Sequence, residues 1–238
     1  MNVQFRRTLL DYATRPYRSA GLFAYKFAEG KLKSDPAFFG LLENGLLPNA
    51  ERLIDLGCGQ GLLASWLLEA RKLHECGNWP PHWPPAPKIN HIWGLELMQK
   101  DVDRARAALG DSAQFYQGDI RSADYGKADV AVVLDVLHYI SYEAQEEVLK
   151  RIWAALPPGG TFITRVGDAA GGLPFYYSNW VDRTIFFLRG HRLNRIYCRT
   201  LDEWLEVLRS TGFEVRPLAM HKGTPFRNVM LIAKKTGE

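Results

Sequence analysis

The chain has 238 residues, of which 47% are hydrophobic, so one large domain with a sizeable core is expected. No apolar run approaches the roughly 18 residues of a transmembrane helix, and the polar first residues predict no secretory signal. A formal net charge of +4 is too weak alone to indicate nucleic-acid binding. The three cysteines lie far apart and form no CxxC, which favours free thiols in a reducing cytoplasm.

Helices are predicted over residues 1–48, where DPAFFGLLENGLLP has an Asp-Pro start and apolar residues at helical spacing. Beyond this segment, apolar runs alternate with amphipathic ones. Strands are predicted over 52–56, 91–97, 113–119, 128–137 and 161–166. Helices are predicted over 62–73, 100–109 and 143–156. Strands that alternate with helices indicate a parallel sheet with right-handed crossovers.

The C-terminal part predicts one more helix and two strands. Thr200 and Glu203 form a capping box before LDEWLEVLRS, and Gly212 closes that helix. Residues 213–218 and 229–235 then predict an antiparallel pair at the sheet edge. The expected fold is α/β, with a Rossmann-like seven-stranded sheet that is mostly parallel, has an antiparallel edge strand and carries helices on both faces.

Two segments interrupt the alternation, and we interpret both as insertions. Residues 74–90 are rich in Pro and Trp, and residues 167–199 separate the fifth strand from the capping-box helix. The expected organisation is therefore an N-terminal helical segment, 1–48, followed by one domain, 49–238, that carries both insertions.

A glycine-rich turn, DLGCGQG, follows the first predicted strand. Its glycines permit positive φ and close approach of a ligand at the carboxyl end of the strand. A dinucleotide fingerprint would need glycine at position 62, which is Leu62. We assign Gly57 and Gly59 to close approach and Gly61 to helix packing.

With the acids that follow it, this turn resembles the first motif of the class I S-adenosylmethionine-dependent methyltransferases. The resemblance runs from about Glu51 to Gly160 and includes GLEL, QGDI and VVLDVLHYI followed by LPPGG. It implies that the chain is such an enzyme and that it binds S-adenosylmethionine. It also implies that residues 1–48 cover the cofactor site and that residues 167–199 form a cap over the acceptor.

The resemblance also assigns the cofactor contacts. Glu96 would hold both ribose hydroxyls, because an ionised carboxylate only accepts hydrogen bonds. Asp119 would accept from the adenine amino group, with capping of the next turn as the alternative, and Asp55 would orient the turn and the methionyl end. The other predicted cofactor contacts are Cys58, Leu97, Met98, Ile120, Leu134 and Asp135.

His138 follows the fourth strand, where methyl donor and acceptor are expected to meet. An ordinary, near-neutral pKa would suit it as a general base, and packing of the cofactor loop is the alternative role. The same two roles, in catalysis or in packing, are open for Tyr139. Most of the rate is expected from positioning, since the methyl group of a sulfonium is already activated.

The acceptor is predicted from the second insertion. Tyr176, Tyr177 and Trp180 indicate a small aromatic or lipophilic acceptor, methylated on oxygen or carbon. No motif of nucleic-acid amino methyltransferases is present, so no nucleic acid is expected as a partner. The chain also resembles methyltransferases of bacterial aryl-polyene and related pigment clusters, which implies an aromatic head group, free or held on an acyl carrier.

Three further features leave alternatives open. The basic run 183–199 would suit an acyl carrier protein, a phosphopantetheine, an anionic lipid at a membrane surface, or a merely solvated face. Trp79 and Trp83 would form a flap near adenine, a membrane or partner contact, or a surface insertion. Their neighbouring His and Cys residues fit no usual zinc spacing, so no metal is expected. The rival functions are a non-catalytic sensor or scaffold that binds S-adenosylmethionine and, less in keeping with Leu62, a nicotinamide-dependent oxidoreductase.

Overall fold

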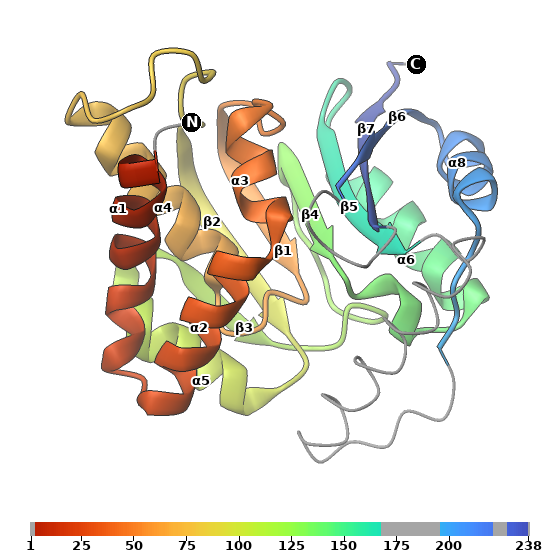
Figure 1. Ribbon diagram of the computed structural model, residues 1–238. Helices are drawn as coiled ribbons and strands as arrows, with labels where there is room; N and C mark the ends of the chain where they lie inside the picture. Colours follow the sequence, from red (N-terminus) through yellow and green to blue (C-terminus); the bar gives the residue numbers. More distant parts are fainter. Residues whose placement is uncertain (1–2, 168–195, 221–227, 238) are drawn as a thin grey trace. The chain divides into compact units, whose positions relative to one another are not determined.

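The computed structural model describes residues 3–167, 196–220 and 228–237 (Figure 1). Its strands are β1 (Ala50–Leu56), β2 (Ile89–Glu96), β3 (Gln114–Gln117), β4 (Val130–Leu134), β5 (Thr161–Gly167), β6 (Phe213–Ala219) and β7 (Asn228–Lys235). They form a seven-stranded sheet in the order β3-β2-β1-β4-β5-β7-β6. The predicted Rossmann-like, mostly parallel sheet is confirmed. Its antiparallel strand is β7, which pairs with both β5 and β6 and so lies one place in from the edge.

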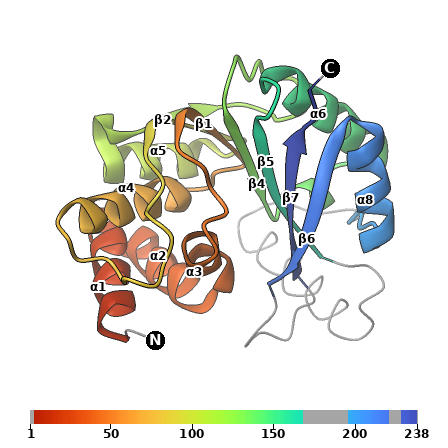
Figure 2. The same cartoon turned by 90° about the horizontal axis from the view of Figure 1, so that it is seen from above.

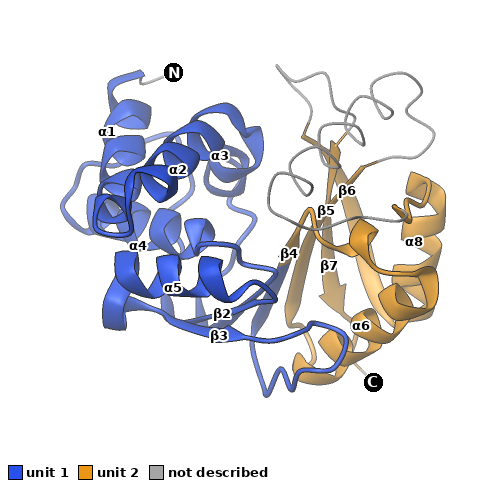
Figure 3. Ribbon diagram, turned by 90° about the horizontal axis from the view of Figure 1, so that it is seen from below, with its two compact units in different colours: residues 1–132 blue, residues 133–238 orange. Residues whose placement is uncertain are grey.

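The described helices are α1 (Val3–Thr14), η1 (Arg15–Arg18), α2 (Leu22–Ser34), α3 (Pro36–Glu43), α4 (Leu62–Glu75), α5 (Gln99–Leu109), η2 (Gly110–Ser112), η3 (Leu137–Tyr139), α6 (Tyr142–Ala155) and α8 (Leu201–Ser210). The chain divides into two compact units, residues 1–132 and 133–238 (Figure 3). Among the residues that the structure describes, no helix is both long and apolar enough to cross a membrane.

Local signals in the sequence account for the helix starts. The Asp35 carboxylate accepts from the Ala37 N–H at 2.9 Å and so caps α3. At α8, Thr200 and Glu203 make the predicted capping box. The strand predicted over 128–137 is wrong in its length, because the chain leaves β4 at Asp135, whose φ of +59° is left-handed.

The N-terminal helices α1, α2 and α3 gather beside α4 within the first unit (Figures 1 and 2). Trp66 of α4 is fully buried, lies 4.7 Å edge-on from the ring of Phe39, and donates from Nε1 to the Phe38 carbonyl at 2.9 Å. On the same helix, the Ser65 hydroxyl donates to the Ala13 carbonyl at 2.7 Å. These bonds satisfy buried polar groups while joining the N-terminal helices to the helix that follows the glycine-rich turn.

Candidate functional site

The glycine-rich turn leaves β1 and enters α4 with three left-handed glycines. The φ angles are +80° at Gly57, +55° at Gly59 and +79° at Gly61. The N–H groups of Gly57 and Cys58 both donate to the Leu95 carbonyl, at 2.7 and 3.1 Å. The turn is therefore fixed on the neighbouring strand β2, which ends with the acid that follows Leu95.

Gly59 and Gly61 face different surroundings. A Cβ at Gly61 would lie 2.7 Å from the Phe115 ring and 3.3 Å from Ala105, so glycine is needed there for packing against α5 and β3. A Cβ at Gly59 would meet no protein atom within 4 Å. Gly59 therefore presents open space where the sequence predicts close approach of the cofactor.

Glu96 lies at the end of β2 and is half-buried. Its Oε2 accepts from the Gly59 N–H and its Oε1 from the Met98 N–H, each at 2.9 Å. Two backbone N–H groups, one from the glycine-rich turn and one from the residue pair that follows β2, therefore hold the Glu96 carboxylate in one orientation. Its contact with the ribose hydroxyls remains a prediction.

Asp55, at the end of β1, is buried with only 4% of its surface exposed. Burial, and then repulsion by the Glu96 carboxylate, raises the pKa of Asp55 to about 7. Two acids so close together favour a bound cation. S-adenosylmethionine carries positive charge on its sulfonium and its amino group, so the charges of this cluster fit that cofactor.

Asp119, which the sequence predicts to contact adenine, already has hydrogen-bond partners within the chain. The Arg121 guanidinium contacts both oxygens of Asp119, and the Arg121 backbone N–H donates to Oδ1 at 2.9 Å. These bonds, with the side-chain bond as the largest cause, lower the pKa of Asp119. Asp119 thus caps its own turn, and its contact with adenine remains a prediction. Leu97 is exposed and Ile120 is buried.

In the second unit, Leu134 ends β4 and Asp135 follows it. Asp135 forms a bidentate ion pair with Arg165 of β5, in which Nε donates to Oδ1 at 2.7 Å. The Arg165 side chain is 3% exposed. Among the described residues, Asp135 is the one non-glycine with positive φ, and such strain persists where neighbouring contacts fix the conformation. Sequence reasoning missed Arg165, whose only signal is one charge inside the apolar strand TFITRV.

His138 lies in η3, and its ring centroid is 4.0 Å from that of Tyr139. The near-neutral pKa expected for it is wrong. Burial of the imidazole lowers the pKa of His138 to about 4, with Arg165 lowering it further and Asp135 opposing. The side chain is therefore neutral at physiological pH, and it is a far weaker base than an exposed histidine.

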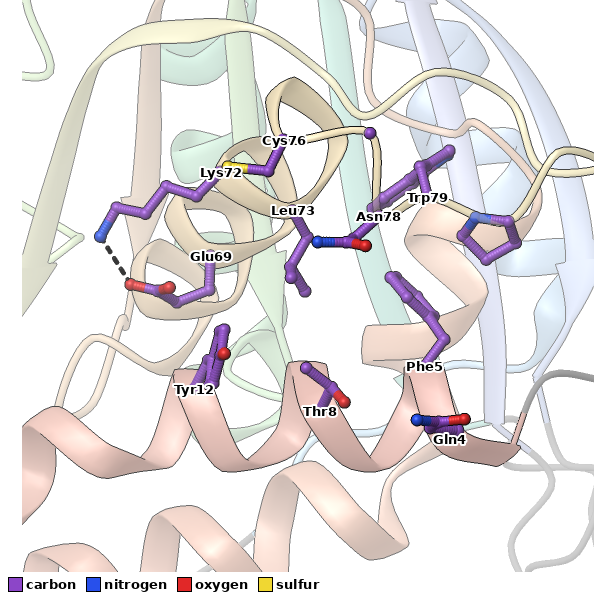
Figure 4. Close-up of a pocket in the computed structure, with 12 residues that line it drawn as sticks. Gln4, Phe5, Thr8, Tyr12, Glu69, Lys72, Leu73, Cys76, Asn78 and Trp79 are labelled. Carbon is purple, nitrogen blue, oxygen red and sulfur yellow. Dashed lines mark hydrogen bonds and ion pairs between the residues drawn. The ribbon is translucent and has the colours of Figure 1, made fainter.

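The first insertion packs on the N-terminal helices. The rings of Trp79 and Trp83 each lie 5.3 Å edge-on from Phe5 of α1, and Trp83 lies 6.5 Å from Phe39 of α3. Beside this cluster is a pocket of about 620 Å³ between α1, the end of α4 and the insertion (Figure 4). No residue of the glycine-rich turn lines it.

Three predicted acceptor residues, Tyr176, Tyr177 and Trp180, lie outside the described residues, as does most of the basic run 183–199. Of that run's arginines only Arg199 is described. Its guanidinium is held by Glu146 at 2.7 Å and by the Gln145 amide oxygen at 2.9 Å, so it is not part of a free basic surface.

Comparison with known proteins identifies the family of the chain. A family model described as a methyltransferase domain matches residues 25–218. Two curated proteins named carboxy-S-adenosyl-L-methionine synthase are similar to this chain. The one from Chromohalobacter salexigens is 30% identical over 129 residues, and the one from Campylobacter fetus is 29% identical over 123. The matches cover 52% of this chain and 43% and 47% of those proteins, so less than half of each relative is spanned.

Solved structures share the fold. The putative methyltransferase in complex with the Trm112 activator of Haloferax volcanii superposes over 100% of both chains, with a TM-score of 0.64 and 15% identity. An O-methyltransferase family protein from Burkholderia thailandensis gives 0.61 and 21%, over 93% of this chain and 63% of that one. Human N-acetylserotonin methyltransferase in complex with S-adenosylmethionine gives 0.58 and 20%, over 95% and 59%. The methyltransferase-domain model that matches residues 25–218 shows that the chain belongs to the class I S-adenosylmethionine-dependent methyltransferase family.

Proposed function

We propose that the chain transfers a methyl group to oxygen or carbon of a small aromatic or lipophilic acceptor. The observation that carries this proposal is the half-buried His138 in η3, the turn that follows β4, whose imidazole is neutral and lies against the Tyr139 ring. A neutral imidazole beside an aromatic ring suits an acceptor with one polar group on an apolar body. Two of the proteins with the same fold are named as an O-methyltransferase family member and an N-acetylserotonin methyltransferase.

The first unit would hold the cofactor. Glu96 binds the ribose hydroxyls, Asp55 orients the methionyl end, and the open side of Gly59 admits the cofactor against the backbone. The N-terminal segment 1–48 covers this site, and its link to the turn is the bond from the Gln60 amide nitrogen to the Ala24 carbonyl at 2.8 Å. The remaining proposed contacts in this unit are Gly57, Cys58, Leu97, Met98, Asp119 and Ile120. The contacts that the resemblance implies for Gly61 and, in the second unit, for Leu134 and Asp135 stay predictions from the sequence.

The bound cofactor supplies a methyl group that its sulfonium already activates. The protein's contribution is then to orient the acceptor and exclude water. A His138 with a pKa of about 4 cannot remove the proton of a phenol in advance. Its neutral nitrogen can accept a hydrogen bond from the hydroxyl, aim the oxygen lone pair, and receive the proton as the new bond forms.

Two parts of this proposal concern the surroundings of the enzyme. The free thiols of Cys58, Cys76 and Cys198 suit a reducing compartment such as the cytoplasm. The proposal that an acyl carrier protein presents the acceptor depends on the basic run alone, and Arg199 of that run is already paired with Glu146. Free acceptors are therefore the first choice for a test.

The experiment is a labelled-methyl screen. The chain would be incubated with methyl-labelled S-adenosylmethionine and a panel of phenols and hydroxyaryl acids, free and carrier-bound, with Glu96→Ala as the control. Label in an organic product, lost in the control, is the expected result. Turnover only of non-aromatic polar acceptors would contradict the proposal.

A second candidate is favoured by the two curated relatives, whose name describes synthesis of carboxy-S-adenosylmethionine. Such an enzyme modifies the cofactor instead of passing on its methyl group. Mass spectrometry of the ligand released from the purified chain separates the two functions. A cofactor heavier by one carboxyl group would favour this second candidate, whereas S-adenosylmethionine or S-adenosylhomocysteine would favour methyl transfer.

A further inference from the structure

Gln145 of α6 is fully buried and joins three separate stretches of backbone. Its amide nitrogen donates to the carbonyls of Leu137 at 3.1 Å, Ile140 at 3.2 Å and Tyr197 at 2.8 Å. An amide NH₂ has two hydrogens, so the three carbonyls share them. The first two carbonyls bracket η3, the short turn that carries His138.

Arg199 fixes the other side of the same amide. Its Nε donates to the Gln145 oxygen at 2.9 Å, and its Nη2 donates to the Tyr142 carbonyl at 3.2 Å and to Glu146 at 2.7 Å. The guanidinium also lies over the Tyr142 ring, 4.8 Å from its centroid. With only 12% of its side chain exposed, Arg199 is held in one geometry by a planar fork that a lysine could not reproduce.

The chain just before α8 is joined to η3 directly as well. The Tyr197 N–H donates to the His138 carbonyl at 2.9 Å. The Tyr142 hydroxyl donates to the Cys198 carbonyl at 3.1 Å, and the Tyr142 and Tyr197 rings meet edge-on at 5.5 Å. Residues 197–199 and η3 thus form one hydrogen-bonded layer on α6.

A turn as short as η3 does not hold its own shape. Its internal bonds are Tyr139 N–H to the Val136 carbonyl and Ile140 N–H to the Leu137 carbonyl. Helical turns of three residues are not stable without outside contacts. The buried amide of Gln145 supplies those contacts from one side and the 197–199 backbone supplies them from the other.

We propose that Gln145 and Arg199 are positioning residues, which hold the His138 turn in the geometry that methyl transfer requires. The inference rests on the proposed role of His138 at the acceptor. Neither residue touches the acceptor in this account. Each acts through the backbone of residues 137–140.

The test uses two variants in the full-length chain. Gln145→Glu keeps the size and the oxygen acceptor for Arg199 but removes the N–H donors to all three carbonyls. Arg199→Lys keeps the charge near Glu146 but loses the bond to Gln145. The matched control is Glu147→Gln on the same helix, where the side chain is 58% exposed.

Amide hydrogen exchange, measured residue by residue, is the readout that needs no acceptor. In Gln145→Glu the amides of Tyr139, Ile140 and Tyr197 should exchange at least tenfold faster than in the wild type, with a smaller increase in Arg199→Lys. Exchange in the glycine-rich turn and the affinity for S-adenosylhomocysteine should not change. In the labelled-methyl assay kcat should fall at least tenfold with an unchanged KM for S-adenosylmethionine.

Unchanged exchange at these three amides in both variants would overturn the proposal. So would a parallel loss of cofactor affinity, because the cluster would then serve general stability. If Gln145→Glu does not fold, Arg199→Lys decides alone. If no phenol is methylated even by the wild type, the proposed acceptor class fails, while the exchange result still decides whether the turn is held by Gln145.

Discussion

Asp55 and His138 make the free energy of unfolding depend on pH in opposite directions. The pKa of Asp55 is raised to about 7 in the fold, whereas an aspartate in an unfolded chain has a pKa of about 3.9. The pKa of His138 is lowered to about 4, whereas an unfolded histidine has about 6.5. Between these values the folded state binds an extra proton at Asp55 and one fewer at His138.

The signs follow from proton counting. Stability rises with pH wherever the unfolded state binds more protons. For His138 the unfolded state binds more, so its contribution to the free energy of unfolding rises by about 2 kcal/mol from pH 5 to pH 7. For Asp55 the folded state binds more, so its contribution falls by about 2 kcal/mol over the same interval. In the wild type the two slopes nearly offset each other.

Urea unfolding of the cofactor-free chain at pH 5, 6 and 7 tests this pair. Asp55→Asn should make the free energy of unfolding rise with pH by about 2 kcal/mol over that interval, and His138→Gln should make it fall by about 2 kcal/mol. The titratable groups around Asp55 are Glu96, the buried Cys58 and the buried Tyr17, and both variants keep them. The exposed acid Asp111 provides a control, since Asp111→Asn should leave the slope as in the wild type. An Asp55→Asn slope equal to the wild-type slope would refute the reasoning.

Other substitutions test the turn and the ion pair. Gly59→Ala should weaken S-adenosylhomocysteine binding at least tenfold in calorimetry, because the new methyl enters the open side of the turn; Gly110→Ala, also left-handed and open, should not. Gly61→Ala should lower the free energy of unfolding in urea by about 1–3 kcal/mol, because its Cβ would overlap the Phe115 ring. Arg165→Met should lower the Tm by an amount equivalent to about 3 kcal/mol, because the Asp135 carboxylate loses the buried guanidinium that offsets its charge. An Arg165→Met Tm equal to that of the wild type would show that the pair contributes no net stability.

Much of the fold could be predicted because its signals are local. The Asp-Pro start of α3, the capping box of α8 and the spacing of glycines around α4 each depend on neighbouring residues. The end of β4 could not be predicted, because an apolar run is the same whether it continues a strand or packs as a short turn. Leu137 is buried, as the pattern indicated, but in η3.

The site depends more on distant partners, and there the sequence was less informative. Glu96 accepts a hydrogen bond from the glycine-rich turn. The two lie together because they lie at the carboxyl ends of β1 and β2, which are neighbouring parallel strands of the sheet. Arg165 lies 30 residues from Asp135, and nothing local predicts their pairing. The pKa of His138 likewise depends on burial in the folded chain and on Arg165, which lies on another strand. The Trp79 and Trp83 insertion packs on Phe5, a contact that no nearby pattern indicated.

We propose that the first unit holds S-adenosylmethionine through Glu96. The most direct measurement is calorimetry of S-adenosylhomocysteine with the wild type and Glu96→Ala. We expect one site per chain in the wild type, with binding weakened by about 2–3 kcal/mol in the variant, the scale of hydrogen bonds to a charged group. Equal affinity in the two proteins would contradict it.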